Sequence, residues 1–182
     1  MKTYIAILRG INVGGHRVIK MDALKVLMFE IGLENVQTYI QSGNIVFQKK
    51  DASTHDLEKS ISAAILDKFS FEVPVIVLEH QELSNIIAQN PFVNTNGIEE
   101  SFLHLTFLSA KPNEGFYEQI KELKFGEDSF LLKETTLHIY CPNGYGNTKL
   151  NNSFFESKLK VNATTRNWKT SKKLLDMAES LM

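Results

Sequence analysis

Polar residues and glycines follow the first apolar segment of the chain, in the stretch RGINVGGHRVIKM at residues 9–21. Besides three glycines and an asparagine, this stretch holds four groups that are or can become cationic, on Arg9, His16, Arg17 and Lys20. Glycines let backbone N–H groups approach an anion closely, and the start of a following helix favours negative charge. A guanidinium can bind a phosphate or carboxylate through two hydrogen bonds. The residue types therefore indicate an anion-binding loop.

A second polar stretch, CPNGYGNTK at residues 141–149, has a similar composition and is followed by TTRNW at residues 164–168. Together they offer backbone donors, a guanidinium and the only tryptophan of the chain. The indole ring could stack on a base or a sugar, or it could anchor the last helix to the core. The candidate ligand contacts in this second cluster are Arg166, Asn167 and Trp168.

The elements that must position these residues begin with alternating strand and helix patterns in the first half of the chain. Runs of β-prone residues predict strands, and apolar residues at helical spacing predict helices between them. The predicted strands cover residues 3–9, 35–41, 44–48 and 73–79, and the predicted helices follow Asp22 and Ser53 or Thr54. The resulting order β-α-β-β-α-β is that of a ferredoxin-like unit.

Single residues mark the expected boundaries of these elements. Asp22 is the predicted N-cap of the first helix, and Gly32 is expected to end that helix. The pair Ser42–Gly43 between two β-prone runs predicts a hairpin turn. Pro74 predicts that the fourth strand begins there or lies at a sheet edge, because proline cannot donate a hydrogen bond to a neighbouring strand.

The second half of the chain repeats this order after a short helix at residues 80–89. Strands are predicted at 102–108 and 162–166, a hairpin at 129–141 that turns near Glu134–Thr135, and helices at 113–123, 150–159 and 168–181. The boundary is expected near residues 90–97, which divides the chain into domains 1–90 and 91–182. We therefore predict an α+β fold of two ferredoxin-like (βαββαβ) units, with antiparallel sheets, helices on one face and a C-terminal helix.

This topology brings the polar segments together within each half. The first two strands of a βαββαβ sheet run in the same direction, so the loop after the first and the turn after the second emerge at one edge. RGINVGGHR is thus expected beside QSGN at residues 41–44. In the second half, the third strand and the strand at residues 162–166 should end at a common edge, which places residues 141–149 near residues 164–168. The candidate ligand contacts in the first half are Arg9, Gly10, Asn12, Gly14, Gly15, Lys20, Gln41, Ser42 and Asn44.

The same residues also have a purely structural interpretation. Gly14 and Gly15 could form a tight turn, Arg9 could pair with a surface carboxylate, and Asn44 could serve only the hairpin. The stretch is not a GxGxxG motif, and Lys20 is followed by Met21 rather than by Ser or Thr. Neither the dinucleotide-binding fingerprint nor the P-loop signature is therefore met.

Several of these segments occur together in one known family. LRGINVGG, then KM, TYIQSGNIVF, VPVIV, NPF and ATTRNW resemble the family labelled domain of unknown function 1697, over Tyr4 to Leu175. The resemblance implies bacterial, cytoplasmic proteins built from two ferredoxin-like units, and it supplies no catalytic roles. The positions that match its motifs are Arg9, Gly10, Asn12, Gly14, Gly15, Lys20, Gln41, Ser42, Gly43, Asn44, Arg166, Asn167 and Trp168. Lys169 and Ser171 depart from the family's usual final motif.

The composition narrows the functional classes. The 182 residues carry a formal net charge of −1, which excludes a strongly basic nucleic-acid binder but not a local basic patch. The single cysteine, Cys141, fits a reducing cytoplasm, and no run is long enough to span a membrane. The five histidines lack metal-ligand spacing, so neither a metal site nor a cofactor is predicted. His104 and His138 lie in predicted strands and are expected to point outward.

Three functions remain compatible with the sequence. The first is a protein that binds a phosphate-bearing ligand, either a nucleotide or a nucleic-acid end, through the two polar clusters. The second is a small phosphohydrolase similar to acylphosphatases, in which Arg9 would hold the phosphate and Asn44 would orient the water. The third is a protein-interaction module, present as a monomer or a homodimer. Whether the protein is an enzyme is left open by the sequence.

Overall fold

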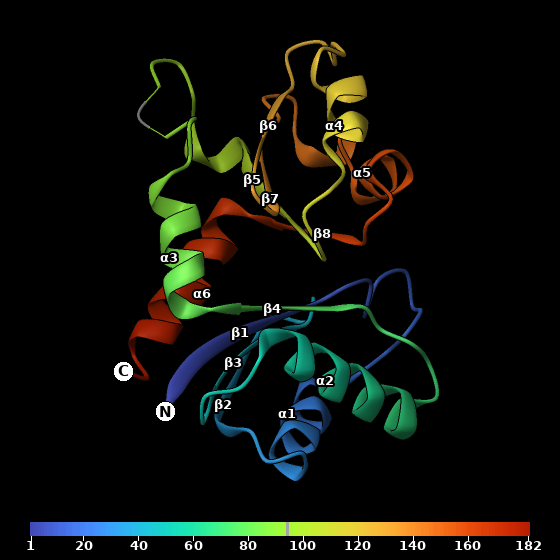
Figure 1. Cartoon of the computed structure of the whole chain (residues 1–182), viewed down its shortest axis with the longest axis vertical. Helices are drawn as coiled ribbons and strands as arrows, with labels where there is room; N and C mark the ends of the chain where they lie inside the picture. Colours follow the sequence, from blue (N-terminus) through green and yellow to red (C-terminus); the bar gives the residue numbers. More distant parts are fainter. Residues whose placement is uncertain (94) are drawn as a thin grey trace. The chain divides into compact units, whose positions relative to one another are not determined.

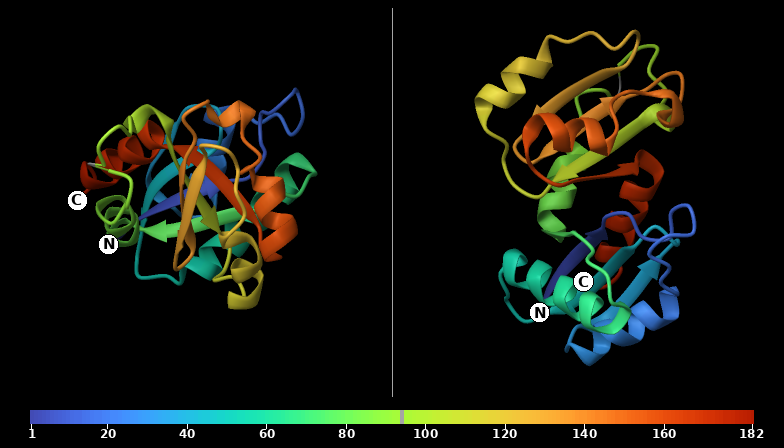
Figure 2. Two further views of the ribbon diagram at one scale, coloured as in Figure 1. Left: turned by 90° about the horizontal axis from the view of Figure 1, so that it is seen from above. Right: turned by 90° about the vertical axis from the view of Figure 1, so that its right-hand side faces the viewer.

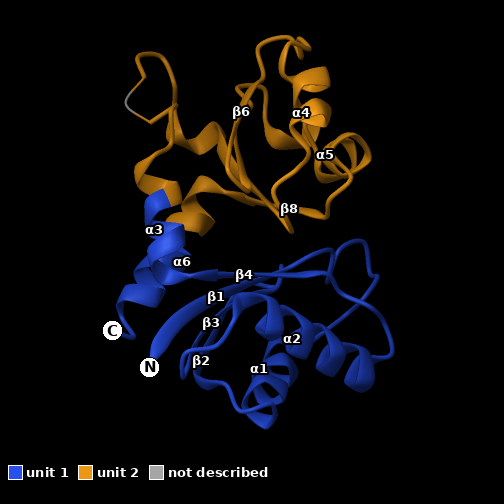
Figure 3. Ribbon diagram, in the orientation of Figure 1, with its two compact units in different colours: residues 1–85, 173–182 blue, residues 86–172 orange. Residues whose placement is uncertain are grey.

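The chain forms two compact units in the computed structural model, which describes residues 1–93 and 95–182 (Figure 3). Unit 1 contains Met1–Asn85 together with Lys173–Met182, and unit 2 contains Ile86–Lys172. Each unit holds one four-stranded antiparallel sheet. Within the described ranges, we find no helix with the length and apolar character needed to cross a membrane.

Unit 1 is a ferredoxin-like sheet with two helices (Figure 1). Its elements are β1 (Lys2–Leu8), α1 (Met21–Glu30), β2 (Glu34–Tyr39), β3 (Asn44–Lys49), α2 (Thr54–Phe69) and β4 (Val75–Glu79), followed by α3 (His80–Ala88). The strand order is β2-β3-β1-β4, and all neighbouring pairs are antiparallel. The predicted βαββαβ order is thus confirmed, and β4 with its preceding Pro74 lies at an edge as expected.

Helices α1 and α2 cover one face of this sheet (Figure 2, right). Every second residue of β1, beginning with Tyr4, belongs to the core that the helices close. The rings of Tyr4 and Phe47 stack with centroids 5.6 Å apart. The Tyr4 hydroxyl donates to the Ala52 carbonyl at 3.0 Å and accepts from the Ala52 amide at 3.1 Å. A buried tyrosine therefore fixes the segment that leads into α2.

The ends of the helices follow most of the local signals. Ser53 caps α2 and accepts a hydrogen bond from the Asp56 amide at 3.4 Å, as predicted. Gly32, with φ +76°, follows the last turn of α1 as predicted. The predicted N-cap Asp22 is wrong, because α1 begins at Met21 and its N-cap is Lys20, two residues before the predicted cap. Asp22 instead lies in the first turn, where its charge is favourable to the helix dipole.

The hairpin between β2 and β3 is present, but its turn is longer than the Ser42–Gly43 pair suggested. Strand β2 ends at Tyr39, and residues 40–43 form the turn. Both ends of this turn lie in the left-handed region, with φ +49° at Ile40 and +79° at Gly43. The positive φ at Ile40 ends the extended conformation two residues before the predicted end of the strand.

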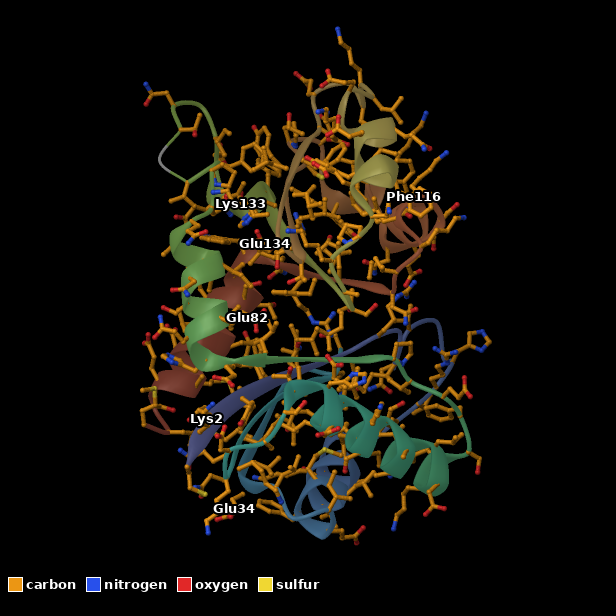
Figure 4. The ribbon with its side chains drawn as sticks, in the orientation of Figure 1. Lys2, Glu34, Glu82, Phe116, Lys133 and Glu134 are labelled. Atoms are coloured by element: carbon orange, nitrogen blue, oxygen red, sulfur yellow. The ribbon has the colours of Figure 1, made fainter. Side chains whose placement is uncertain are left out.

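Unit 2 repeats the topology of unit 1. Its elements are β5 (Leu103–Leu108), α4 (Glu114–Lys121), β6 (Ser129–Lys133), β7 (Thr136–Tyr140), α5 (Asn152–Leu159) and β8 (Ala163–Asn167), with short 3₁₀ turns at Glu100–Phe102 and Tyr145–Asn147. The strand order is β6-β7-β5-β8, and the hairpin turns at Glu134–Thr135 as predicted, directly after Lys133 (Figure 4). Helix α6 (Trp168–Glu179) is the predicted C-terminal helix.

Aromatic side chains dominate the core that α4 and α5 close over the sheet of unit 2. Phe125, Phe130, Phe154 and Phe155 pack edge to face, with neighbouring centroids 5.2–6.0 Å apart. Asn113 and Asn151 cap the two helices with their side-chain oxygens.

The expectation that His104 and His138 point outward is wrong. His138 is 1% exposed and His104 is 9% exposed. Alternation along β7 sends Leu137 and Ile139 into the core under the helices and His138 to the opposite face, which is also buried. Desolvation lowers the pKa of His138 to about 4, so its imidazole is neutral near pH 7.

We expect His138 to make the protein less stable as the pH falls. The unfolded histidine takes up a proton near pH 6.5, whereas the folded one does so only near pH 4, so acid favours the unfolded chain. From pH 7.5 to 5.0 this should lower the free energy of unfolding by about 2 kcal/mol, measured by urea denaturation. His138→Gln should remove this part of the pH dependence and the exposed control His55→Gln should not. Equal slopes in both variants would contradict the assignment.

Candidate functional site

The glycine-rich loop after β1 and the turn after β2 lie together in unit 1, as the topology predicts. The Leu8 amide donates to the Gly43 carbonyl at 2.8 Å. The Asn12 side-chain amide donates to the Gln41 carbonyl at 2.7 Å. Residues about thirty positions apart in the sequence are therefore joined into one polar edge of the sheet.

Gly43 is required by the closeness of this contact. A Cβ atom at Gly43 would lie 2.7 Å from Leu8 Cβ and 2.8 Å from Ile11 Cδ1. Ile11 itself is buried beneath the turn. With its φ of +79°, Gly43 also has a backbone conformation that other residues rarely adopt. Two independent constraints therefore select glycine here.

Asn12 closes the base of the loop. Its amide nitrogen donates to the carbonyls of Ile19 and Gln41, and its side-chain oxygen accepts from the Ile19 amide at 2.8 Å. The Asn12 backbone amide donates to the Arg17 carbonyl at 3.2 Å. Both donor hydrogens of this predicted ligand contact are thus used inside the protein, and Asn12 positions the loop.

The tip of the loop is a tight turn exposed to solvent. Val13 and His16 form an isolated β-bridge, with the His16 amide 3.0 Å from the Val13 carbonyl. Gly14 and Gly15 between them have φ of +59° and +77°, the signs that a type I′ turn requires at both central residues. The tight-turn interpretation of this glycine pair therefore describes its backbone, while both glycines remain accessible.

Cationic side chains surround this loop. His16, Arg17 and Lys20 are exposed. Arg17 folds back toward the base of the loop, because its Nη1 atom lies 3.6 Å from the position of a Cβ on Gly10. Arg9 is half-buried, its backbone amide donates to the Pro74 carbonyl at 2.9 Å, and it makes further contacts within the protein. The accessible positive charge is therefore on Arg17 and Lys20.

Asn44 and Ser42 hold the turn from within. Asn44 is fully buried, and its amide nitrogen donates to the Tyr39 carbonyl and the Ser42 hydroxyl, both at 3.0 Å. Because both donor hydrogens are occupied in this way and the side chain is fully buried, Asn44 holds the turn from within. Gln41, in contrast, offers an exposed side chain at the same turn.

The second predicted pairing, between residues 141–149 and the strand that contains TTR, is also present in unit 2. The Tyr145 hydroxyl donates to the Thr165 hydroxyl at 2.9 Å, and Thr165 donates to the Asn152 side-chain oxygen at 2.7 Å. The ring of His104 stacks on Tyr145 with centroids 4.7 Å apart. The strand register places Thr106 opposite Thr165, and their hydroxyl oxygens lie 2.7 Å apart. Because strand register is not visible in the sequence, these hydroxyl groups were not among the candidate site residues.

The three candidates at the end of β8 support the fold. The Arg166 guanidinium donates to the Thr164 hydroxyl and the Thr165 carbonyl, makes further contacts, and is buried, so desolvation lowers its pKa to about 10. The Asn167 side-chain oxygen accepts from the Thr170 amide at 2.8 Å and so caps α6. Trp168 is 4% exposed, which matches the core role considered for it.

Cys141 is a poor nucleophile, and the residues that the structure describes hold no cluster suited to a metal ion. Cys141 is buried directly after β7, and desolvation raises the pKa of its thiol to about 11. A thiol with so high a pKa is a weak nucleophile near pH 7. Across residues 1–93 and 95–182, histidine, cysteine, aspartate and glutamate side chains form no group of three that could hold a metal ion.

The fold and the loop positions define an α+β protein of two ferredoxin-like units, one of which carries a long polar loop at a sheet edge. The model of the family described as "Protein of unknown function (DUF1697)" matches residues 1–138, and the chain belongs to this family. The solved structure of a conserved bacterial protein from Streptococcus pneumoniae is similar, with a TM-score of 0.74 and 22% identity. That match covers 97% of this chain and 98% of the other. No curated protein matches the chain significantly.

The contact at Gly43 predicts a pair of variants with different stabilities. Gly43→Ala should lower the free energy of unfolding by about 2–4 kcal/mol, because a left-handed backbone and a steric clash are combined. Gly15→Ala is the matched control, since its φ of +77° is nearly the same and its Cβ would meet no atom within 4 Å. It should cost only about 1 kcal/mol. Equal losses in urea denaturation would mean that the packing around Gly43 can relax.

Proposed function

We propose that the loop after β1 and the turn after β2 bind a phosphate-bearing ligand, a nucleotide or a nucleic-acid end. Residues 9–20 would supply the positive charge and the accessible backbone, and the turn at residues 40–43 would form the other wall. The hydrogen bonds from Leu8 to Gly43 and from Asn12 to Gln41 support this proposal, because they join the two segments before a ligand arrives.

A difference between the two units carries the proposal. Both units close the end of their first strand in the same way: Leu8 donates to Gly43 at 2.8 Å in unit 1, and Leu108 donates to Thr135 at 2.9 Å in unit 2. In unit 2 the following helix is reached through residues 109–113, whereas unit 1 uses residues 9–20. The longer, cationic loop is therefore not needed to make the fold, and long ordered loops on a rigid scaffold are commonly functional.

The charge pattern of the loop favours an anion. Residues 9–20 contain Arg9, His16, Arg17 and Lys20 and no acidic residue. The Arg17 guanidinium lies against Gly10, which has no side chain of its own, so the guanidinium and the Gly10 backbone are adjacent and could both contact one anion. Exposed charges of one sign raise the local concentration of an oppositely charged ligand, and added salt weakens this effect.

Asn12, Asn44, Asn167 and Trp168 take positioning roles in this proposal, because their polar atoms or rings are used within the protein. The ligand contacts are then the exposed parts of the loop and turn, from Gly10 to Lys20 and at Gln41. We infer binding rather than hydrolysis, since Asn44, the residue considered for orienting a water, is fully buried and donates both amide hydrogens to the turn. A reducing compartment such as the cytoplasm fits the single buried thiol.

Arg17→Gln should weaken the binding of AMP to the full-length protein about tenfold, which corresponds to about 1.4 kcal/mol. The physical reason is the loss of a charge-assisted hydrogen bond to phosphate. Isothermal titration calorimetry at low and moderate salt would measure this change, and thermal shifts would check it by mass action.

Lys59→Gln on α2 is the control, because it removes an exposed charge far from the loop in the sequence. The control should bind AMP as the wild type does. Absence of binding by the wild type to AMP and to a 5′-phosphorylated oligonucleotide would overturn the proposal. So would an equal loss of affinity in Arg17→Gln and Lys59→Gln.

A further inference from the structure

Ile40 has a backbone conformation that is unfavourable for its type of side chain. Its φ is +49°, in the left-handed region, and its side chain branches at Cβ. Ile40 is nevertheless 49% exposed, so burial does little to offset this cost. Asparagine or glycine would adopt this conformation more readily. The choice of isoleucine is therefore not explained by the stability of unit 1.

Hydrogen bonds on both sides of Ile40 hold it in this conformation. The preceding carbonyl, of Tyr39, accepts from the buried Asn44 side chain at 3.0 Å. The following carbonyl, of Gln41, accepts from the Asn12 side chain at 2.7 Å. A strained residue persists when its surroundings determine its conformation from several directions, as they do here.

Two further exposed apolar side chains belong to the loop that is tied to this turn. Val13 is 64% exposed and Val18 is 62% exposed. They alternate along the loop with His16 and with the cationic residues Arg17 and Lys20. The edge thus offers both apolar surface and positive charge, whereas a site for inorganic phosphate alone would need only the charge.

We propose that Ile40, together with Val13 and Val18, is the part of this site that recognises the base of a nucleoside phosphate. This inference rests on the proposed function, which assigns the phosphate to the cationic loop. A base presents a flat, largely apolar face, and aliphatic side chains can contact that face whichever base it is. The β-branched side chain of Ile40 has few rotamers, so its contact surface is already ordered before binding.

This ligand chemistry could come from a free nucleotide or from the 5′ end of a nucleic acid, because both carry a phosphate and a base on one sugar. Ribose 5-phosphate has the phosphate and the sugar but no base. Inorganic phosphate has the charge alone. Comparing these four compounds therefore separates recognition of the base from recognition of the phosphate.

The test is isothermal titration calorimetry of wild type, Ile40→Asn and Ile40→Gly with inorganic phosphate, ribose 5-phosphate, AMP and a 5′-phosphorylated trinucleotide. The wild type should bind AMP at least tenfold more tightly than ribose 5-phosphate. Both variants should bind AMP about fivefold more weakly and ribose 5-phosphate unchanged. They should also unfold at a temperature roughly 3 °C higher, because the strained isoleucine is gone. Val26→Ala, on the exposed face of α1, should change neither quantity.

The outcomes separate this inference from the proposed function. Equal affinity of the wild type for AMP and ribose 5-phosphate would overturn the role of Ile40 and leave phosphate binding intact. Unchanged AMP affinity in both variants would do the same. If the wild type bound none of the four compounds, the proposed function and the inference would both be wrong. Tighter binding of the trinucleotide than of AMP would identify a nucleic-acid end as the ligand, and the reverse a free nucleotide.

Discussion

The hydrogen bond from the last residue of the first strand to the hairpin turn is the contact on which each unit depends. It joins Leu8 to Gly43 in unit 1 and Leu108 to Thr135 in unit 2. In unit 1 the contact is so close that residue 43 has no room for a Cβ atom, because Leu8 and the buried Ile11 occupy that space. This fixed base lets the loop extend beyond the sheet without loosening the sheet itself.

Hydrophobic periodicity and turn residues predicted the fold because both follow from the local geometry of helices, strands and turns. The order of strands and helices follows from β-prone runs and helical spacing, and Pro74 and Ser53 marked an edge strand and a helix cap correctly. Asp22 failed as a cap because an acidic residue is favourable both at the cap and in the first turn. His104 and His138 failed because a strand pattern does not say whether both faces of a sheet are covered.

The candidate site was predictable in its location but not in the roles of its members. Topology alone places the loop beside the turn, and the structure confirms that contact through Asn12 and Gln41. An asparagine among glycines suits a ligand and a backbone carbonyl equally well, so the sequence could not assign Asn12 or Asn44 to the loop's own hydrogen bonds. Ile40 escaped notice because its φ, which makes it unusual, is not visible in its residue type.

Two sets of residues have different roles at this edge: the side-chain amides of Asn12 and Asn44, and the exposed residues of the loop and turn. The side chains of Asn12 and Asn44 donate to backbone carbonyls and so hold the backbone of the turn in place. This edge would therefore lose little conformational freedom on binding a ligand. The exposed set, with Arg17 and Ile40, would supply the contacts of the proposed ligand site. Substitutions in the first set should therefore act on stability and those in the second on affinity, except that Ile40, with its strained backbone, should affect both.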